Sequence, residues 1–328
     1  MILVVGGAGF IGSHMTKLLR EKGEPHIVFD NLENGHRSAL QGSPFFEGDL
    51  RNPLDIERVL DQYPGIDTVI DFAAYIAVGE SVREPGKYYR NNVFGTLNLL
   101  EAMRHRGIDK FVFSSTAAVY GEPEYTPIDE YHPCRPINPY GQSKLMVEQL
   151  LSDFGQAHCL RSVCLRYFNA AGSDPDAVLG EDHDPEEHLI PVALLAAIGK
   201  RDGMKIFGDS YPTPDGTCVR DYVHVLDLAS AHMLAVNYLR QGGESTKMNL
   251  GNGVGFSVRE VLETASEVVG KEIGYEMAPP RPGDSPILVA NSERIKAEWG
   301  WKPVHTKLSD IISHAWAWRV KHPNGFGD

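Results

Sequence analysis

The sequence is poor in three features that mark particular classes of protein. Only four cysteines occur among 328 residues, and their spacing fits no metal site. No apolar run approaches the ~20 residues needed to cross a bilayer. Lys and Arg (31) are outnumbered by Asp and Glu (44), which gives a net charge of −13. These shortages argue against a disulfide-stabilised secreted domain, a membrane protein and a nucleic-acid-binding protein. We therefore expect a cytoplasmic protein with reduced thiols that binds neither nucleic acid nor membrane.

The first half of the sequence alternates regularly between strand-like and helix-like segments. Short apolar runs are separated by stretches with helical spacing of apolar residues, of which 53–63 and 85–105 are two. This alternation predicts an α/β fold with a doubly wound parallel sheet that is covered by helices on both faces. The expected strands are 2–5, 27–30, 68–71, 110–113 and 161–166.

A glycine-rich turn follows the first expected strand. Gly6, Gly9 and Gly12 lie three apart, just before a helical pattern. The first glycine permits a tight turn, the second lets the backbone approach a pyrophosphate, and the third lets the helix pack on the strand. The spacing differs from the common Gly-x-Gly-x-x-Gly, and a glycine triplet alone is weak evidence for a dinucleotide site.

Asp30 strengthens the dinucleotide interpretation. It ends the second expected strand, ~20 residues beyond the glycines, where the dinucleotide-binding pattern places an acidic residue. A carboxylate there can accept hydrogen bonds from both hydroxyls of the adenosine ribose, and it repels a 2′-phosphate. The position therefore favours NAD over NADP, although a solvated turn residue is the alternative.

The character of the sequence changes after the strand at 161–166. Residues 169–191 are rich in Gly, Asp, Glu, His and Pro and predict a loop, and shorter mixed elements follow. We expect a dinucleotide-binding domain over residues 1–170 and a smaller mixed α/β domain over 171–328, with some elements returning to the first domain. The cleft between the two domains is the expected substrate site.

Tyr140 and Lys144 stand at the start of a predicted helix that Pro139 suits as a first residue. Residues four apart share a helix face, so the two side chains should project together. A lysine ammonium ~5 Å from a phenol would lower its pKa from ~10 by roughly two units, which would make it a usable general base. The alternative is chance spacing on a surface. Thr116, expected at the same sheet edge as the glycine turn, argues against chance.

Motifs along nearly the whole chain support these assignments together. Those in the first half are Gly6-x-x-Gly9-x-x-Gly12, Asp30-Asn31, Gly48-Asp49-Leu50, Asn91-Asn92-Val93, Ser114-Ser115-Thr116 and Tyr140-x-x-x-Lys144. Those in the second half are Arg166-Tyr167-Phe168-Asn169, Gly180-Glu181-Asp182, Val219-Arg220-Asp221-Tyr222 and Arg281-Pro282-Gly283-Asp284. The first set resembles the extended short-chain dehydrogenase/reductase family. The second set is more specific and resembles the UDP-glucose 4-epimerases within that family.

The resemblance implies a Rossmann domain that binds NAD and a smaller domain that binds a UDP-sugar. It implies that Tyr140 is the base, that Lys144 binds the nicotinamide ribose and tunes Tyr140, and that Thr116 hydrogen-bonds the reacting sugar hydroxyl. The family more often has serine in that last position, and threonine keeps the hydroxyl. The residues implied to contact NAD are Gly6, Gly9, Phe10, Ile11, Gly12, Asp30, Asn31, Asp49, Leu50, Phe72, Ala73, Ala74, Asn92, Thr116, Tyr140, Lys144 and Phe168.

The resemblance also implies which residues hold the substrate. Beside Thr116 and Tyr140 at the sugar, they are Asn169, His188, Leu189, Arg220, Arg281 and Asp284. Guanidinium groups suit a diphosphate because they bind it in bidentate fashion. The alternatives are surface ion pairs for the two arginines, a loop cap for Asp284 and a plain loop histidine for His188.

The implied reaction is the interconversion of UDP-glucose and UDP-galactose: transient NAD⁺-dependent oxidation at C4, rotation of the 4-keto sugar, and reduction on the opposite face. Related dehydratases and decarboxylases usually carry an acid near the hydroxyl residue, where this chain has Ala117 and Ala118. An epimerase of another UDP-sugar, such as an N-acetylhexosamine, pentose or uronate, stays open because Leu288, in a position thought to gate bulk, has intermediate size. A non-catalytic NAD-binding sensor is the alternative from another class. By analogy, helices 85–105 and 140–151 could pair in a homodimer.

Overall fold

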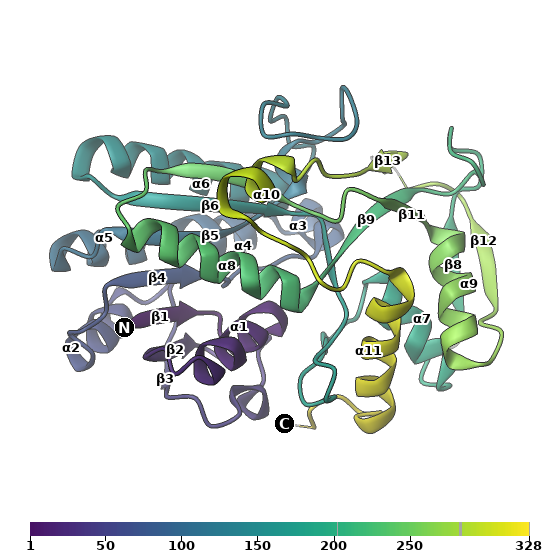
Figure 1. Cartoon of the computed structure of the whole chain (residues 1–328), viewed down its shortest axis with the longest axis horizontal. Helices are drawn as coiled ribbons and strands as arrows, with labels where there is room; N and C mark the ends of the chain where they lie inside the picture. Colours follow the sequence, from purple (N-terminus) through teal and green to yellow (C-terminus); the bar gives the residue numbers. More distant parts are fainter. Residues whose placement is uncertain (202, 282–283, 328) are drawn as a thin grey trace.

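A seven-stranded parallel sheet forms the larger part of the molecule (Figure 1). The computed structural model describes residues 1–201, 203–281 and 284–327. The strand order is β10-β6-β5-β4-β1-β2-β3, and all neighbouring strands run parallel. The predicted doubly wound α/β fold is therefore confirmed. The strands are β1 (Ile2–Val5), β2 (His26–Asp30), β3 (Phe45–Glu47), β4 (Thr68–Asp71), β5 (Lys110–Thr116), β6 (Arg161–Tyr167) and β10 (Thr246–Leu250).

Helices cover both faces of this sheet because alternate residues of its strands point to opposite sides. Ile2 and Val4 pack into one core together with residues of α1, α8 and α10, whereas Leu3 and Val5 pack into the other with residues of α2, α5 and α6. Figure 1 shows α1 and α8 side by side on the face turned to the viewer. These helices are α1 (Phe10–Glu21), α2 (Pro53–Gln62), α5 (Thr96–Arg106), α6 (Pro139–His158), α8 (Val225–Arg240) and α10 (Glu293–Trp299).

The helix predicted over 85–105 is not uniform. It consists of α4 (Pro85–Tyr88), a π-helical segment η2 (Tyr89–Gly95) and α5, and a further helix, α3 (Val78–Arg83), precedes it. The prediction of one regular helix was thus wrong at η2, which contains Asn92. A π-helical turn is uncommon and often marks a functional site.

A smaller group of strands and helices lies at the other end of the molecule (Figure 1). Its four-stranded sheet has the order β11-β9-β13 with β7 also paired to β9, and β8 pairs with β12. The elements are β7 (Asn169–Ala171), α7 (Leu189–Ala197), β8 (Met204–Phe207), β9 (Val219–His224), β11 (Gly255–Ser257), α9 (Val258–Val269), β12 (Tyr275–Ala278), β13 (Ile287–Leu288) and α11 (Leu308–Lys321), and two 3₁₀ helices elsewhere are η1 (Arg37–Leu40) and η3 (Ala117–Val119). The prediction of a continuous loop over 169–191 was therefore wrong at its start, where β7 forms.

The chain crosses between the two groups more than once. β10 follows the strands of the smaller group in sequence but pairs with β6 in the large sheet. Elements of the second half thus do return to the first, as expected, while the boundary at 170/171 stays a prediction. Within the described residues, none of the helices combines the length and the apolar character needed to cross a membrane.

Candidate functional site

The glycine turn leaves room for a ligand at one position and none at the others. Gly6 has a φ of +72°, and a Cβ there would lie 2.6 Å from the Ala73 nitrogen. A Cβ on Gly12 would overlap the backbone oxygen of Gly6. A Cβ on Gly9 would meet only that oxygen, at 3.5 Å, so the space beyond Gly9 is open. The third glycine therefore serves packing and the second faces an open cradle.

The N-terminus of α1 opens onto this cradle. The helix begins at Phe10, and its N-cap, Gly9, has no side chain to bond the first backbone N–H groups. Such N–H groups have no partner within the helix, and the helix dipole adds partial positive charge. The N-terminus, including Phe10 and Ile11, can therefore bind an anionic group such as a pyrophosphate.

Asp30 lies at the carboxyl end of β2, beside the glycine turn. Its Oδ2 accepts the N–H of Ala8 at 2.9 Å, and its Oδ1 accepts the N–H of Leu32 at 2.9 Å. Burial raises the pKa of Asp30, and these N–H groups oppose that effect. Because a carboxylate oxygen can accept more than one hydrogen bond, the fixed group can still bind two ribose hydroxyls.

Asp49 and Asn31 form the next part of the same edge. Arg51 donates from Nε to Asp49 Oδ1 at 2.9 Å, and Asn31 donates to Asp49 Oδ2 at 3.1 Å. The hydrogen bond from Arg51 is the main reason why the pKa of Asp49 is lowered to about 2. The Leu50 side chain is buried in the core, so only its backbone can border a cofactor.

Asn92 holds the segment that follows β4. Its Oδ1 accepts the N–H of Tyr75 at 2.9 Å, and its Nδ2 donates to the Tyr75 carbonyl at 3.0 Å. Nδ2 also donates to Ser143 Oγ at 3.0 Å, which links this segment to α6. The π-helical segment thereby fixes the backbone around Phe72, Ala73 and Ala74, which lies against Gly6.

Tyr140 and Thr116 meet where α6 begins beside the end of β5. Asn138 caps the helix by accepting the N–H of Gly141 at 2.9 Å, and Pro139 starts it. Tyr140 is half-buried, and burial raises its pKa, whereas a hydrogen bond with Thr116 lowers it. Thr116 Oγ1 also accepts the N–H of Ala118 at 3.1 Å, which orients its hydroxyl.

The surroundings of the Lys144 ammonium differ from those assumed in the sequence analysis. Its Nζ donates to the Ser114 carbonyl at 2.9 Å and lies 4.8 Å from the centre of the Phe113 ring. Burial lowers the pKa of Lys144 to about 8, although nearby Asp71 opposes this. The expectation that Lys144 lowers the pKa of Tyr140 is wrong for the chain alone, because burial dominates and the Tyr140 pKa is raised.

The residues expected to bind the UDP part gather only partly, around β9. Arg220 donates to the carbonyls of Val219 at 3.0 Å and Ser285 at 2.8 Å, and its Nη2 lies 3.6 Å from Asp284 Oδ1. The Arg281 guanidinium lies 3.8 Å from the centre of the Phe207 ring. Pro282 and Gly283 of the same motif lie outside the described residues.

The other expected substrate residues occupy neighbouring strands and loops. Asn169, in β7, pairs with Tyr222 of β9. Leu189 starts α7, and the preceding His188 has its Nδ1 within 2.9 Å of Glu181 Oε1 and 3.0 Å of Glu186 Oε1. The remaining expected cofactor residue, Phe168, is buried in a small cluster after β6.

Comparison with known proteins decides the family. The model of the "NAD dependent epimerase/dehydratase family" matches residues 2–251. The chain belongs to the NAD dependent epimerase/dehydratase family. Members of this family are NAD-dependent enzymes, and NAD is accordingly the cofactor of this chain.

Individual proteins of the NAD dependent epimerase/dehydratase family match nearly the whole chain. The UDP-glucose 4-epimerase of Halalkalibacterium halodurans is 51% identical over 99% of this chain and 97% of its own length. A crystal structure of UDP-glucose 4-epimerase from Brucella ovis in complex with NAD has a TM-score of 0.94 and 47% identity, over 96% of this chain and 97% of that chain. One from Bifidobacterium longum, in complex with NAD⁺ and UDP, has a TM-score of 0.94 and 39% identity over 99% of both chains.

The site also contains two groups that the sequence analysis did not identify. Asp71 ends β4, is almost fully buried, and has its pKa raised to about 6 by burial. Tyr167 ends β6, its hydroxyl contacts Ser114 Oγ, and Tyr140 is close enough to influence its pKa. Both occupy carboxyl ends of parallel strands, as Asp30 does, and that shared position is the signal that could have identified them.

Proposed function

We propose that this member of the epimerase family interconverts UDP-glucose and UDP-galactose. The proposal rests on the placement of Thr116 and Tyr140, with Lys144 one turn further along α6, at the same carboxyl edge of the sheet as the open cradle at Gly9. The full-length similarity to UDP-glucose 4-epimerases, at 51% identity to one of them, supports this substrate.

Binding and orientation of the cofactor fall to the first half of the chain. The N-terminus of α1 receives the pyrophosphate, and Asp30 accepts hydrogen bonds from the adenosine ribose. Lys144 holds the nicotinamide ribose, and Phe72, Ala73 and Ala74 line the cofactor. When bound, NAD⁺ would supply the reversible oxidation at C4 of the sugar.

Proton transfer falls to Tyr140. Its Oη takes the proton of the 4-hydroxyl and later returns it, while the Thr116 hydroxyl orients the reacting oxygen. Because burial raises the pKa of Tyr140 in the chain alone, this role requires the pKa to fall when the site is filled. Positive charge placed beside the phenol produces such a fall.

Selectivity for the reaction follows from where charge is present and where it is absent. Arg220 and Arg281 bind the diphosphate and hold the nucleotide while the hexose ring turns. Ala117 and Ala118 follow Thr116 and offer no carboxyl group to eliminate water from the oxidised sugar. Asn169, His188, Leu189 and Asp284 complete the site on the uridine side.

The same proposal includes a cytoplasmic homodimer. Three large apolar side chains are exposed on elements that pack against one another: Val82 (62%) on α3, Phe94 (50%) on η2 and Met146 (40%) on α6. Exposed apolar side chains grouped in this way are typical of a protein interface. A second copy of the chain is the occupant that the resemblance implies for these helices.

The proposal is tested by incubating the NAD-loaded protein with UDP-galactose and following UDP-glucose by proton NMR. We expect an equilibrium mixture of the two sugars without accumulation of NADH. A panel with UDP-N-acetylhexosamines, UDP-pentoses and UDP-uronates ranks the alternative substrates. Faster turnover of one of these would move the assignment to that sugar, and a protein that converts none would be a binder.

A further inference from the structure

A second cluster of chemically active side chains lies in the segment between β7 and α7. It consists of Glu181, His183, Glu186 and His188, and four of its nitrogen and oxygen atoms, one from each residue, lie within 4.8 Å of one another. Both carboxylates are buried, with exposed fractions of 6% for Glu181 and 8% for Glu186, whereas His188 lies at the exposed rim. The cluster is called the Glu/His cluster below.

The spacing of these atoms matches that of donors around a tetrahedral metal ion. His183 Nδ1 lies 3.4 Å from Glu181 Oε1 and 3.5 Å from Glu186 Oε2, and His188 Nδ1 lies 2.9 Å from Glu181 Oε1. Donors bound at about 2.0–2.2 Å in a tetrahedron are roughly 3.3–3.6 Å apart. A small movement of His188 would therefore complete the geometry.

Two of the four donor atoms lack a hydrogen-bond partner although they are buried. Glu186 Oε1 accepts the N–H groups of Glu187 and His188, both at 2.9 Å. Its other oxygen, Oε2, and His183 Nδ1 make no hydrogen bond, and they face each other only as a long ion-pair contact of 3.5 Å. Because buried polar atoms are normally hydrogen-bonded, a metal ion bound to both atoms would satisfy them better than this contact does.

We propose that Glu181, His183, Glu186 and His188 bind one divalent transition-metal ion such as Zn²⁺. Imidazole and carboxylate donors suit Zn²⁺ and the neighbouring first-row ions, and two carboxylates with two neutral imidazoles balance the charge of a divalent cation. The metal site makes no use of Thr116, Tyr140 or Lys144 and shares only His188 with the proposed substrate site, so metal binding can be tested separately through Glu186 and His183.

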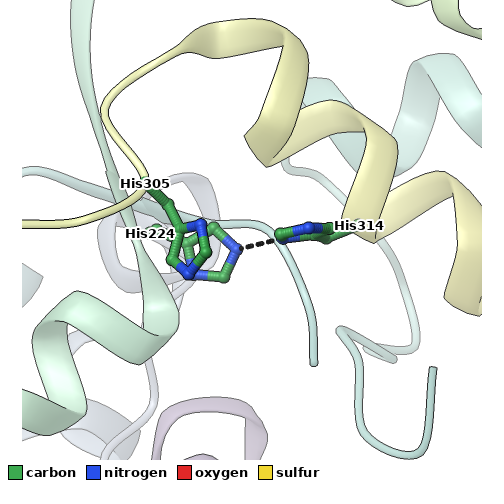
Figure 2. Close-up of side chains that lie close together, drawn as sticks. All are labelled: His224, His305 and His314. Atoms are coloured by element: carbon green, nitrogen blue, oxygen red, sulfur yellow. Dashed lines mark hydrogen bonds between the residues drawn. The ribbon is translucent and has the colours of Figure 1, made fainter. Parts of the chain in front are cut away.

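Among the described residues, the three histidines in Figure 2 form the other cluster that could hold a metal, but two of their ring nitrogens already bond to each other. His224 Nδ1 accepts the N–H of Leu226 at 3.1 Å, so in the neutral ring the proton lies on Nε2. That Nε2 donates to His314 Nδ1 at 3.0 Å, the contact drawn in Figure 2. Both atoms of this contact are thus used, and the His305 ring lies tilted against His224 with ring centres 4.4 Å apart, so the group is a hydrogen-bonded histidine cluster.

The position of the Glu/His cluster indicates what the metal would stabilise. The His183 ring packs edge-on against Phe10, the first residue of α1, with ring centres 6.5 Å apart. The Glu186 carbonyl accepts a hydrogen bond from Arg201 at 3.0 Å, beyond the end of α7. A metal bound here would cross-link the two ends of the 181–188 segment beside α1. Metal binding should therefore raise the melting temperature by a few degrees.

The test uses the full chain, stripped with a chelator, dialysed and then titrated with Zn²⁺ or Co²⁺. We expect one metal ion per chain by elemental analysis, a visible absorption band of four-coordinate Co²⁺, and a higher melting temperature. The variants Glu186→Gln and His183→Ala should weaken metal binding at least 100-fold. The matched control is His305→Asn in the histidine cluster of Figure 2, which should bind metal as the unaltered chain does.

Each other outcome contradicts the proposal. A stripped chain that takes up no metal shows that the Glu/His cluster is a set of imidazolium–carboxylate ion pairs. Metal retained by Glu186→Gln and His183→Ala, or lost in His305→Asn, places the metal elsewhere. If one variant fails to fold, the stoichiometry of the unaltered chain and the second variant still decide the question.

Discussion

At the scale of single residues, the proposed chemistry depends on how burial and charge act on three neighbouring groups. Burial raises the pKa of Tyr140, lowers that of Lys144 to about 8 and raises that of Asp71 to about 6. At neutral pH, Asp71 and Lys144 can therefore form an ionised pair beneath the site. The Lys144 ammonium is thus present before ligands bind, whereas the Tyr140 phenol stays protonated until the site is filled.

Tyr140→Phe should fold, bind NAD and lose epimerisation by several orders of magnitude, because only the phenolic oxygen is removed. The measurement is the rate of UDP-galactose conversion beside the NAD content of the purified protein. Full activity in this variant would refute the role given to Tyr140.

The pH dependence of stability should reveal the lowered pKa of the buried Lys144. Because the pKa of Lys144 is lowered from 10.5 to about 8, the folded chain binds fewer protons than the unfolded chain between these pH values. Stability of the cofactor-free protein should therefore rise with pH across this window, by up to about 3 kcal/mol. Lys144→Met should lack this rise. Parallel pH profiles of the melting temperature for the two proteins would contradict the assignment.

Asp30→Ala should weaken NAD binding and narrow the preference for NAD over NADP. The change removes the acceptor for the ribose hydroxyls and also the charge that repels a 2′-phosphate. It leaves the N–H groups of Ala8 and Leu32 unpaired, so some stability is lost as well. The ratio of the two dissociation constants separates these effects, and an unchanged ratio with unchanged cofactor occupancy would speak against the role.

At the scale of elements, the glycines between β1 and α1 have two different roles: Gly9 leaves space for NAD, and Gly12 allows close packing. Gly9→Ala should fold normally, since the new methyl group would meet only Gly6 O at 3.5 Å, but it should weaken NAD binding at least tenfold by filling the cradle. Gly12→Ala should lower the melting temperature, because its methyl group would overlap the Gly6 backbone. Equal effects of the two substitutions on NAD binding and on stability would contradict this division.

The elements that the sequence predicted are those with a strong local pattern. β1, β2, β4 and α2 have continuous apolar runs or clear helical spacing, and each was expected within a residue or two of its bounds. The strands β11, β12 and β13 were missed because two to four residues carry too little pattern, and pairing with distant strands decides them. The π-helical segment could not be predicted from the sequence either, because it depends on contacts of Asn92 with Tyr75 and Ser143.

The same limit applies to the site. Motifs of two to four residues placed Asp30, Thr116, Tyr140 and Lys144 at one sheet edge, since parallel strands end there together. The direction of the Lys144 ammonium, toward the Ser114 carbonyl and the Phe113 ring, follows from packing that no spacing rule reveals. Sequence thus indicated which groups meet, but not the sign of the Tyr140 pKa shift.

At the scale of the whole molecule, we propose that one part holds the cofactor and the other holds the substrate. The dimer proposed above places the apolar side chains of α3, η2 and α6 against a second copy. Phe94→Glu should shift the protein to a monomer in sedimentation velocity, because dimerisation would then bury a charge in that face. Val304→Glu, exposed to 75% outside that face, is the control and should leave the dimer intact. A chain that is monomeric without substitution would exclude the interface.

In the proposed reaction, the C4 hydrogen of the sugar leaves and returns within one site. The most direct measurement is conversion of UDP-galactose carrying deuterium at C4, with the UDP-glucose product examined by NMR and mass spectrometry. We expect the deuterium to be retained at C4 of the product, in the inverted configuration, with none in solvent. Loss of the label to water would show deprotonation at carbon instead of hydride transfer and would rule out the proposed mechanism.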